Sequence, residues 1–317
     1  MSSGQGQPQL PRRSAWLIAA RPHTLPAAAA PVFVGTGLAV YMNVFAMLPA
    51  LVALLGALLI QIGTNFANDY YDARSGVDTE NRQGFTRVTQ SGLIKPADVR
   101  SAMVATFTLA VLVGSYLVAI GGVPIIVIGV VSIASGVLYA GGPYPFGSYG
   151  LGDLFVFIFF GIVAVTGTYY VQAASFVPAF PLWLPSDTLP VTAILASLPA
   201  AALATNILVV NNMRDRETDR AAGKYSLAVL IGYRWSRIEF LVMTGIAYTI
   251  PVLFWYLGYG PFVLAPLLTL PYAFPIIRTI LQRTDGAALD PALAQVAKLL
   301  AAHSFLFALG LALPAFL

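Results

Sequence analysis

The chain has 317 residues, of which 58% are hydrophobic and 9% charged, and its formal net charge is +4. An ordinary soluble domain has roughly 25% charged residues, so this composition excludes a cytosolic globular enzyme, a disordered protein and a secreted disulfide scaffold. Because the chain has no cysteine, disulfides, cysteine-ligated zinc, iron–sulfur clusters and thiol catalysis are excluded as well.

A helix needs about 20 consecutive apolar residues to cross the hydrocarbon core of a bilayer. The first apolar segment is the weakest of those found, since Arg21, Pro22, His23 and Pro26 interrupt it, and residues 1–11 before it are polar and expected to be disordered. Apolar runs between polar or Gly/Pro-rich breaks predict nine spans, at 15–42, 47–68, 99–120, 123–140, 152–174, 188–212, 236–257, 261–279 and 293–315. These spans use the whole chain, so we expect one all-α, polytopic membrane domain over residues 1–317, with its helices around a central cavity.

The charges predict how the spans are oriented. If the N-terminus is cytoplasmic, all 17 Lys and Arg residues fall in segments on the cytoplasmic side, as the positive-inside rule requires. We therefore expect a multi-pass protein of the cell membrane whose N-terminus is cytoplasmic and whose C-terminus lies on the opposite side. Two long loops, 69–98 and 213–235, hold most of the charge and are expected to cap a cavity that opens to the cytoplasm. They lie about half a chain apart, which suggests a weak internal repeat.

The first loop begins with a cluster of acidic and amide side chains. Asn65, Asn68, Asp69 and Asp72 are spaced i, i+3, i+4 and i+7, so all four share one face of a helix. The second loop begins in a similar way.

In the second cluster, Asn211, Asp215 and Asp219 are spaced i, i+4 and i+8, again on one helix face, and Asn206 lies one turn deeper. Stacked carboxylates raise one another's pKa unless a cation compensates their charge. Hard oxygen ligands without His or Cys favour Mg²⁺, which commonly bridges carboxylates to substrate phosphates. Two such clusters with nearby Lys and Arg therefore indicate a diphosphate site. The alternative is that these are ordinary solvated loop residues, which the matching spacing of two clusters makes less favourable.

The two clusters carry a family resemblance. Asn68-Asp69-x-x-Asp72, together with Asp215-x-x-x-Asp219-x-x-x-Gly223-Lys224 at half-chain spacing, resembles the UbiA superfamily of intramembrane prenyltransferases. The resemblance covers nearly the whole chain. Four further segments narrow the resemblance to the members of this superfamily that prenylate 1,4-dihydroxy-2-naphthoate. These segments are residues 21–26, 141–145, 150–153 and 223–229.

This resemblance implies a UbiA-like fold and a transferase reaction. A polyprenyl group would pass from polyprenyl diphosphate to 1,4-dihydroxy-2-naphthoate, with loss of CO₂ and diphosphate, giving demethylmenaquinone. It implies that Mg²⁺ is the cofactor and that its ligands and the catalytic residues are Asp69, Asp72, Asp215 and Asp219. Many relatives have a further acid at the position of Gly76, whereas this chain has Asp78, which either replaces that acid as a ligand or is a loop residue. The residues expected to contact diphosphate are Asn65, Asn68, Asn206, Asn211, Lys224, Arg21, Arg82 and Arg87.

Three tyrosines between the fourth and fifth spans are candidates for binding the aromatic acceptor: Tyr139, Tyr144 and Tyr149. The alternative is an interfacial aromatic belt, in which Tyr is common. Lys298, near the start of the last span, is expected to snorkel toward the membrane surface. No nucleic-acid partner is expected, only the two substrates and the lipid bilayer.

Two other interpretations remain open. Within the same superfamily, the acceptor could be 4-hydroxybenzoate or homogentisate, or the donor could carry a phytyl chain. In a different class, a membrane transporter also places repeats and embedded acids near a cavity. However, coupling acids usually lie near the bilayer centre, whereas these clusters lie at helix ends.

Overall fold

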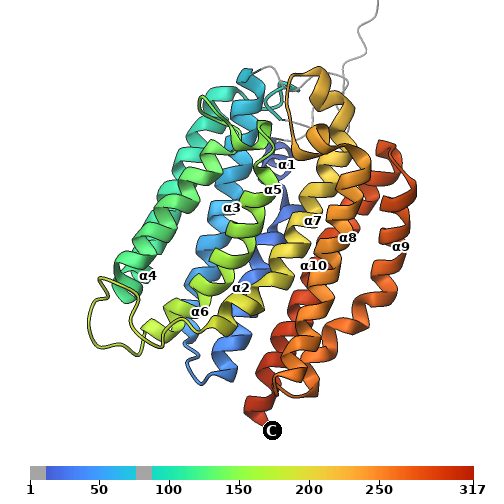
Figure 1. Cartoon of the computed structure of the whole chain (residues 1–317). Helices are drawn as coiled ribbons and strands as arrows, with labels where there is room; N and C mark the ends of the chain where they lie inside the picture. Colours follow the sequence, from blue (N-terminus) through green and yellow to red (C-terminus); the bar gives the residue numbers. More distant parts are fainter. Residues whose placement is uncertain (1–11, 76–87) are drawn as a thin grey trace, which may run out of the picture.

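The computed structural model describes residues 12–75 and 88–317, and these residues are mainly helical, without named strands. The segments expected to cross a membrane run side by side and upright in Figure 1. The helices are α1 (Arg12–Ala20), α2 (Leu25–Tyr41), α3 (Met47–Ser75), α4 (Pro96–Leu138), α5 (Gly152–Phe157), α6 (Ala164–Ala174), α7 (Val191–Ala221), α8 (Leu227–Tyr256), α9 (Leu270–Gln282) and α10 (Gly286–Ala312), with shorter turns η1 (Pro22–Thr24), η2 (Phe146–Ser148), η3 (Ile158–Val163), η4 (Pro261–Thr269) and η5 (Leu313–Phe316).

Eight helical segments among the described residues are long and apolar enough to cross a membrane. One of them, α4, contains a non-helical residue, Gly122, with φ 64° and ψ −149°. Phe107 packs on Gly63 and Gly136 packs on the adjacent Thr64, so both halves of α4 meet α3 at one level. In a straight helix, residues 107 and 136 would lie about 43 Å apart. The chain therefore reverses at Gly122, and the described segments make nine crossings, as the sequence predicts.

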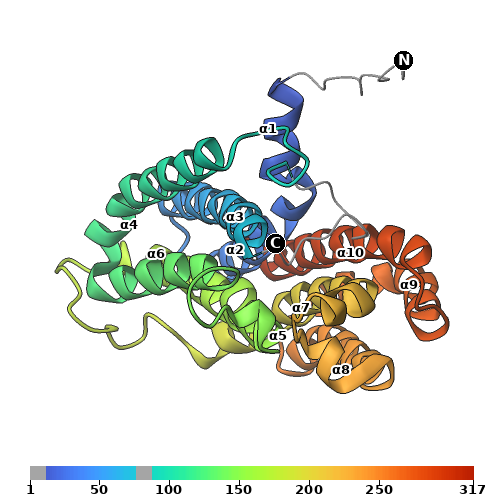
Figure 2. The same ribbon diagram turned by 90° about the horizontal axis from the view of Figure 1, so that it is seen from above.

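The first crossing is interrupted where the sequence pattern is weakest. Arg21 adopts a left-handed conformation with φ 50° and ψ 67°, and η1 follows it before α2 begins. Figure 2 shows α1 leaving the side of the bundle, whereas α2 runs through its middle. Pro22 and Pro26 explain part of this break, because proline fits the first turn of a helix and not its interior.

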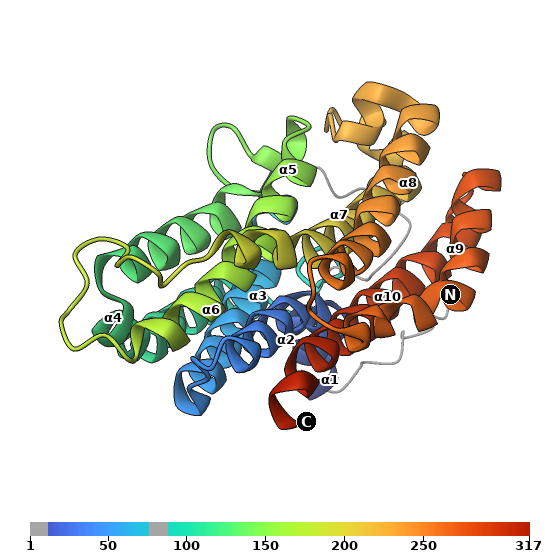
Figure 3. The ribbon, with the colours of Figure 1, turned by 60° about the horizontal axis from the view of Figure 1, so that its bottom comes forward.

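Small residues allow α2 to sit among its neighbours. It packs against α3, α6, α7 and α10. Gly37 meets the backbone of Ala308 in α10, and Gly35 meets Val165 and Thr168 in α6, so a Cβ at either glycine would clash. Such close approach is typical of membrane helices, which associate through packing rather than hydrophobic exclusion from water. Figure 3 shows α4 and α9 at opposite ends of this assembly, with α2 and α10 between them.

Both acidic clusters lie at one end of the bundle. The C-terminal ends of α3 and α7 lie together at the top of Figure 1, and we call this the charged end. The loops after α4 and α7 also meet there, since Tyr225 N–H donates to the carbonyl of Ser148 at 3.1 Å. Gly232, with φ 78°, separates the first turns of α8 from the rest of that helix. Residues 222–231 thus form part of the expected cap, whereas residues 76–87 of the loop 69–98 lie outside the described residues.

Candidate active site

A cavity of about 660 Å³ extends from the charged end into the bundle. Residues from α2, α3, α4, α6, α7 and α10 line it. On α3 the lining positions recur every three or four residues from Ala53 to Asp72, so one helical face borders the cavity for about 28 Å. The lining is polar near the charged end and apolar deeper, and we call the deeper part along α3 and α4 the tunnel. Its shape and polarity suit a molecule with a charged head and a long apolar tail.

The two clusters converge on the polar part of this cavity. Asn68 and Asp72 of α3 line it from one side, and Asn211 of α7 lines it from another. Among the described residues, the Lys and Arg side chains that line the same cavity are Arg21, Arg214, Lys224 and Lys298. Side chains half a chain apart in sequence therefore meet around one space, as the spacing of the clusters predicts.

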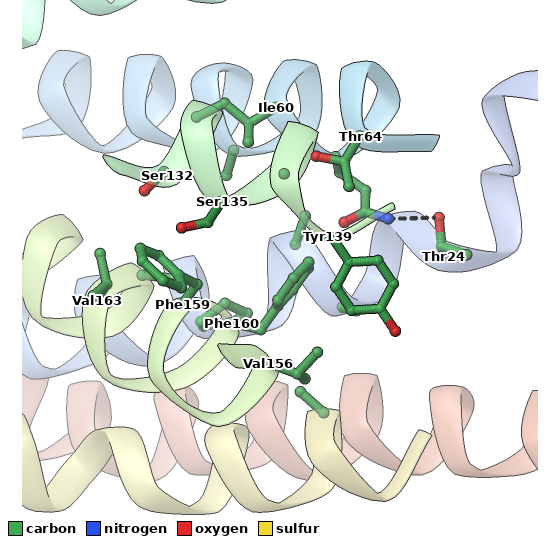
Figure 4. Close-up of a pocket in the computed structure, with 18 of the residues that line it drawn as sticks. Thr24, Ile60, Thr64, Ser132, Ser135, Tyr139, Val156, Phe159, Phe160 and Val163 are labelled. Carbon is green, nitrogen blue, oxygen red and sulfur yellow. Dashed lines mark hydrogen bonds between the residues drawn. The ribbon is translucent and has the colours of Figure 1, made fainter. Parts of the chain in front are cut away.

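Arg21 is positioned by a hydrogen-bond network between α3 and η1. Asn65 donates to the carbonyl of Ala20 and to Thr24 Oγ1, both at 2.9 Å, and Gln61 donates to Thr24 Oγ1 at 3.0 Å. The Thr24 hydroxyl in turn donates to the carbonyl of Arg21 at 2.9 Å. A hydroxyl has one donor and two acceptor sites, so Thr24 is fully satisfied. One hydrogen bond to Thr24 is drawn in Figure 4. Asn65, a predicted diphosphate ligand, thus stabilises the strained turn that places Arg21 at the cavity.

Arg214 is the centre of a buried ion-pair cluster that the sequence did not single out. Its guanidinium donates to both carboxylate oxygens of Asp215, at 2.7 and 2.9 Å, and to Asp290 Oδ1 at 2.7 Å. It also donates to Asn211 Oδ1 at 2.8 Å. The side chain of Arg214 is 3% exposed and that of Asp215 is 0% exposed. In the structure, Asp215 therefore fixes Arg214 at the wall of the cavity.

Lys224 is held by a turn just after α7. Gly223 adopts φ 74°, a conformation that glycine takes without strain, and Lys224 N–H donates to the Asp219 carbonyl at 2.9 Å. The Lys224 ammonium then lies 3.3 Å from Asp219 Oδ2. Asp219 is buried, and it orients the Lys224 ammonium toward the cavity.

The predicted metal ligands are not equally placed. Asp72 lines the cavity, and beside it Asn68 Oδ1 is buried without a hydrogen-bond partner among the described residues. Asp69 is 1% exposed, does not line the cavity and accepts backbone hydrogen bonds from Val88 and Thr89. It thereby ties the chain before α4 to α3.

The oxygen atoms of Asn68 and Asp72 fit Mg²⁺, because this ion needs one or two protein oxygens when phosphate and water complete its coordination. Within residues 12–75 and 88–317, no three His, Cys, Asp or Glu side chains come together as a metal site. Asp78, Arg82 and Arg87, also predicted to contact metal or diphosphate, lie outside the described residues.

Three expected contacts are placed elsewhere by the structure. Asn206 is buried and donates to the Phe240 carbonyl and to Thr244 Oγ1, so it joins α7 to α8 and does not line the cavity. Tyr144 is 71% exposed and Tyr149 is 52% exposed, and their rings pack against each other 5.8 Å apart. These two rings lie on the surface because the loop that carries them folds over the end of the bundle. Neither tyrosine is among the residues that line the cavity, and their contact with an acceptor stays a prediction.

Tyr139 and a group of phenylalanines form the aromatic wall of the cavity. Figure 4 shows Phe159 and Phe160 on one side of the cavity and Ile60, Thr64 and Ser135 on the other, with Tyr139 one helical turn after Ser135. Phe155 stacks on Phe146 with ring centroids 4.0 Å apart, and on Phe159 at 5.9 Å.

Phe159 and Phe160 lie in η3, a π-helical turn, and such turns often occur at functional sites. In the sequence they resemble any lipid-facing apolar residues. The signal that distinguishes them is a helical irregularity, which is not visible in the hydrophobic pattern.

The chain is similar to known membrane enzymes. Residues 28–313 match the UbiA prenyltransferase family. A relative from Escherichia coli (strain K12) named 1,4-dihydroxy-2-naphthoate octaprenyltransferase is 40% identical over 230 residues, which are 71% of this chain and 70% of that protein. A relative of the same name from Bacillus subtilis (strain 168) is 30% identical over 302 residues, 93% and 91% of the two chains. The structure of a UbiA homologue from Archaeoglobus fulgidus bound to GPP and Mg²⁺ has a TM-score of 0.60 at 16% identity and covers 92% of this chain and 99% of that chain.

Proposed function

Because the chain belongs to the UbiA prenyltransferase family, we propose that it transfers a polyprenyl group from polyprenyl diphosphate to 1,4-dihydroxy-2-naphthoate. The products are demethylmenaquinol, the reduced form of demethylmenaquinone, together with CO₂ and diphosphate. The observation that carries this proposal is the convergence of both Asn/Asp clusters and three basic side chains at the mouth of an apolar tunnel. The names of the relatives specify the acceptor.

The diphosphate binds at the charged end of the cavity. Arg21 and Lys224 donate charge-assisted hydrogen bonds to its oxygens. Asn68 and Asp72 would provide the oxygen ligands for Mg²⁺. When bound, this ion would neutralise negative charge on the leaving diphosphate. Asp69, Asp215 and Asp219 remain predicted ligands, and the contacts described above support an additional role for them in positioning the surrounding loop and cations.

The prenyl carbon that ionises lies just inside this diphosphate site. An allylic cation there faces the aromatic wall of Tyr139, Phe155 and Phe159, whose ring faces attract positive charge. The wall also excludes water, which would otherwise capture the cation. The ring of the acceptor then attacks the prenyl carbon and loses CO₂, while the tail occupies the tunnel. We also propose that the charged end is cytoplasmic, because the Lys and Arg residues concentrate there.

The test is prenyl transfer by purified protein in detergent, with radiolabelled 1,4-dihydroxy-2-naphthoate, octaprenyl diphosphate and either Mg²⁺ or EDTA. We expect a lipid-soluble product that requires Mg²⁺ and falls by about a hundredfold in Asp72→Ala, since charge on the leaving group is then less well stabilised. Asp187→Ala, at the opposite end of the bundle, is the matched control and should retain activity.

Other outcomes would redirect the assignment. Product formed only with 4-hydroxybenzoate would preserve the reaction class and replace the acceptor. If folded protein prenylated no aromatic acceptor, the enzyme assignment would be wrong and transport would become the better interpretation.

A further inference from the structure

One part of the cavity is lined by α10, away from the tunnel along α3 and α4. On α10, the cavity-lining residues Leu293, Ala294, Ala297 and Lys298 are spaced so that they share one helical face. Alanines of α2, α7 and α10 contribute small side chains to the lining of this part of the cavity. We call this space the recess and define it by Ala27, Ala204, Ile207, Ala294, Ala297 and Lys298.

Lys298 lies deeper in the bundle than the cations at the cavity mouth. The hydrogen bond between Arg214 and Asp290 fixes the register of α10 against α7. Lys298 comes eight residues after Asp290, which places its Cα about 12 Å further from the charged end. Because side chains on a helix tilt toward its N-terminus, the Lys298 ammonium extends back toward the charged end and reaches the inner side of the diphosphate site.

Lys298 also differs from the other cavity cations in its contacts. Arg214 is satisfied by Asp215, Asp290 and Asn211, and Lys224 is paired with Asp219. Lys298 is exposed and lines the cavity, and it has no hydrogen bond or ion pair with another residue in the described part of the chain. An ionisable side chain within a membrane-crossing helix is costly to retain without a partner, so a bound anion is the expected compensation.

We propose that Lys298 binds the carboxylate of the aromatic acceptor and thereby holds its ring in the recess beside the reacting prenyl carbon. This inference rests on the proposed function. We favour the carboxylate over diphosphate as the anion that Lys298 binds. Lys298 lies deeper in the bundle than Asp72, Arg214 and Lys224, and the ring of the acceptor must lie at this depth to reach the prenyl carbon. The tunnel side of the cavity remains available for the prenyl tail.

The experiment compares wild type with Lys298→Met and Lys298→Arg, measuring KM for each substrate separately. We expect KM for 1,4-dihydroxy-2-naphthoate to rise about tenfold in Lys298→Met, with KM for octaprenyl diphosphate unchanged and partial rescue in Lys298→Arg. With 1,4-dihydroxynaphthalene, which lacks the carboxylate, wild type and Lys298→Met should behave alike. Gln295→Met, on the same helix and outside the cavity lining, is the matched control.

The outcomes separate this inference from the proposed function. If wild type does not prenylate the naphthoate, the proposed function fails and the inference fails with it. If wild type is active and Lys298→Met keeps a normal KM for the naphthoate, Lys298 only snorkels and the inference alone is overturned. An equal loss of activity with the naphthoate and with 1,4-dihydroxynaphthalene would also overturn the inference. Lys298 would then contribute either to diphosphate binding or to folding, and a thermal unfolding scan of Lys298→Met distinguishes these two roles.

Discussion

A layer of glycines gives the sharpest prediction about how the tunnel holds a prenyl tail. Phe107 packs on Gly63, so in these antiparallel helices Gly114, seven residues later, is level with Gly56, seven residues earlier. The contact between Gly136 and Thr64 places Gly129 at the same level, because these two helices run in parallel. Gly56, Gly114 and Gly129 line the tunnel, and beyond the adjoining backbone of its own helix no described atom lies within 4 Å of the position where each would carry a Cβ.

Gly129→Leu should fill the tunnel at this level without disturbing the fold. The layer lies sixteen residues from Asp72 along α3, or about 24 Å. An extended isoprene unit of four carbon–carbon bonds spans roughly 5 Å, so a geranyl tail ends above this layer and an octaprenyl tail must pass it. Removing a five-carbon unit from the tunnel loses about 4 kcal/mol of apolar burial. Because a displaced tail still contacts lipid, we expect a smaller fall in kcat/KM for octaprenyl diphosphate, about tenfold to a hundredfold.

The assay measures kcat/KM for geranyl and octaprenyl diphosphate with the same acceptor. Geranyl transfer by Gly129→Leu should stay near wild type, while octaprenyl transfer falls. Gly245→Leu is the control, because Gly245 also has open space at its Cβ position but lies on α8, outside the cavity lining. An equal effect on both donors would refute the reasoning, since the long tail would then not follow the tunnel past the glycine layer.

Three further predictions concern the contacts around the cavity. Arg214→Met removes the guanidinium that donates two hydrogen bonds to the buried carboxylate of Asp215, so we expect the free energy of unfolding to fall by about 3–5 kcal/mol, measured by denaturant titration in detergent; an unchanged midpoint would contradict this. Asn65→Ala removes the hydrogen bonds that hold the turn at Arg21, and each polar group left unsatisfied should lower the stability of that turn by about 1–3 kcal/mol. In steady-state kinetics, KM for octaprenyl diphosphate should therefore rise more than KM for the acceptor. Phe159→Ala should lower kcat by about tenfold through weaker cation–π stabilisation, whereas Tyr144→Ala, at the surface, should match wild type; similar values for the two variants would argue against the aromatic wall.

The sequence by itself determined the crossings and the end of the bundle at which the site lies. The length of an apolar run and the Gly and Pro residues that interrupt it are local properties, so all nine crossings follow from them, including the reversal at Gly122. Helical spacing likewise placed Asp72 and Asn211 on faces that meet at the cavity. The distribution of Lys and Arg then assigned both clusters to one end.

Only the tertiary structure decided which of these side chains reaches the cavity. Asp69 and Asp72 share a broad helical face, yet one binds the backbone at Val88 and the other lines the cavity. Spacing fixes the angle between two side chains on a helix, but the rotation of that helix is set by its packing against neighbours distant in sequence. The same reason explains why Asn206 faces α8 and why Lys298, expected to snorkel, lines a recess formed with α7 and α2.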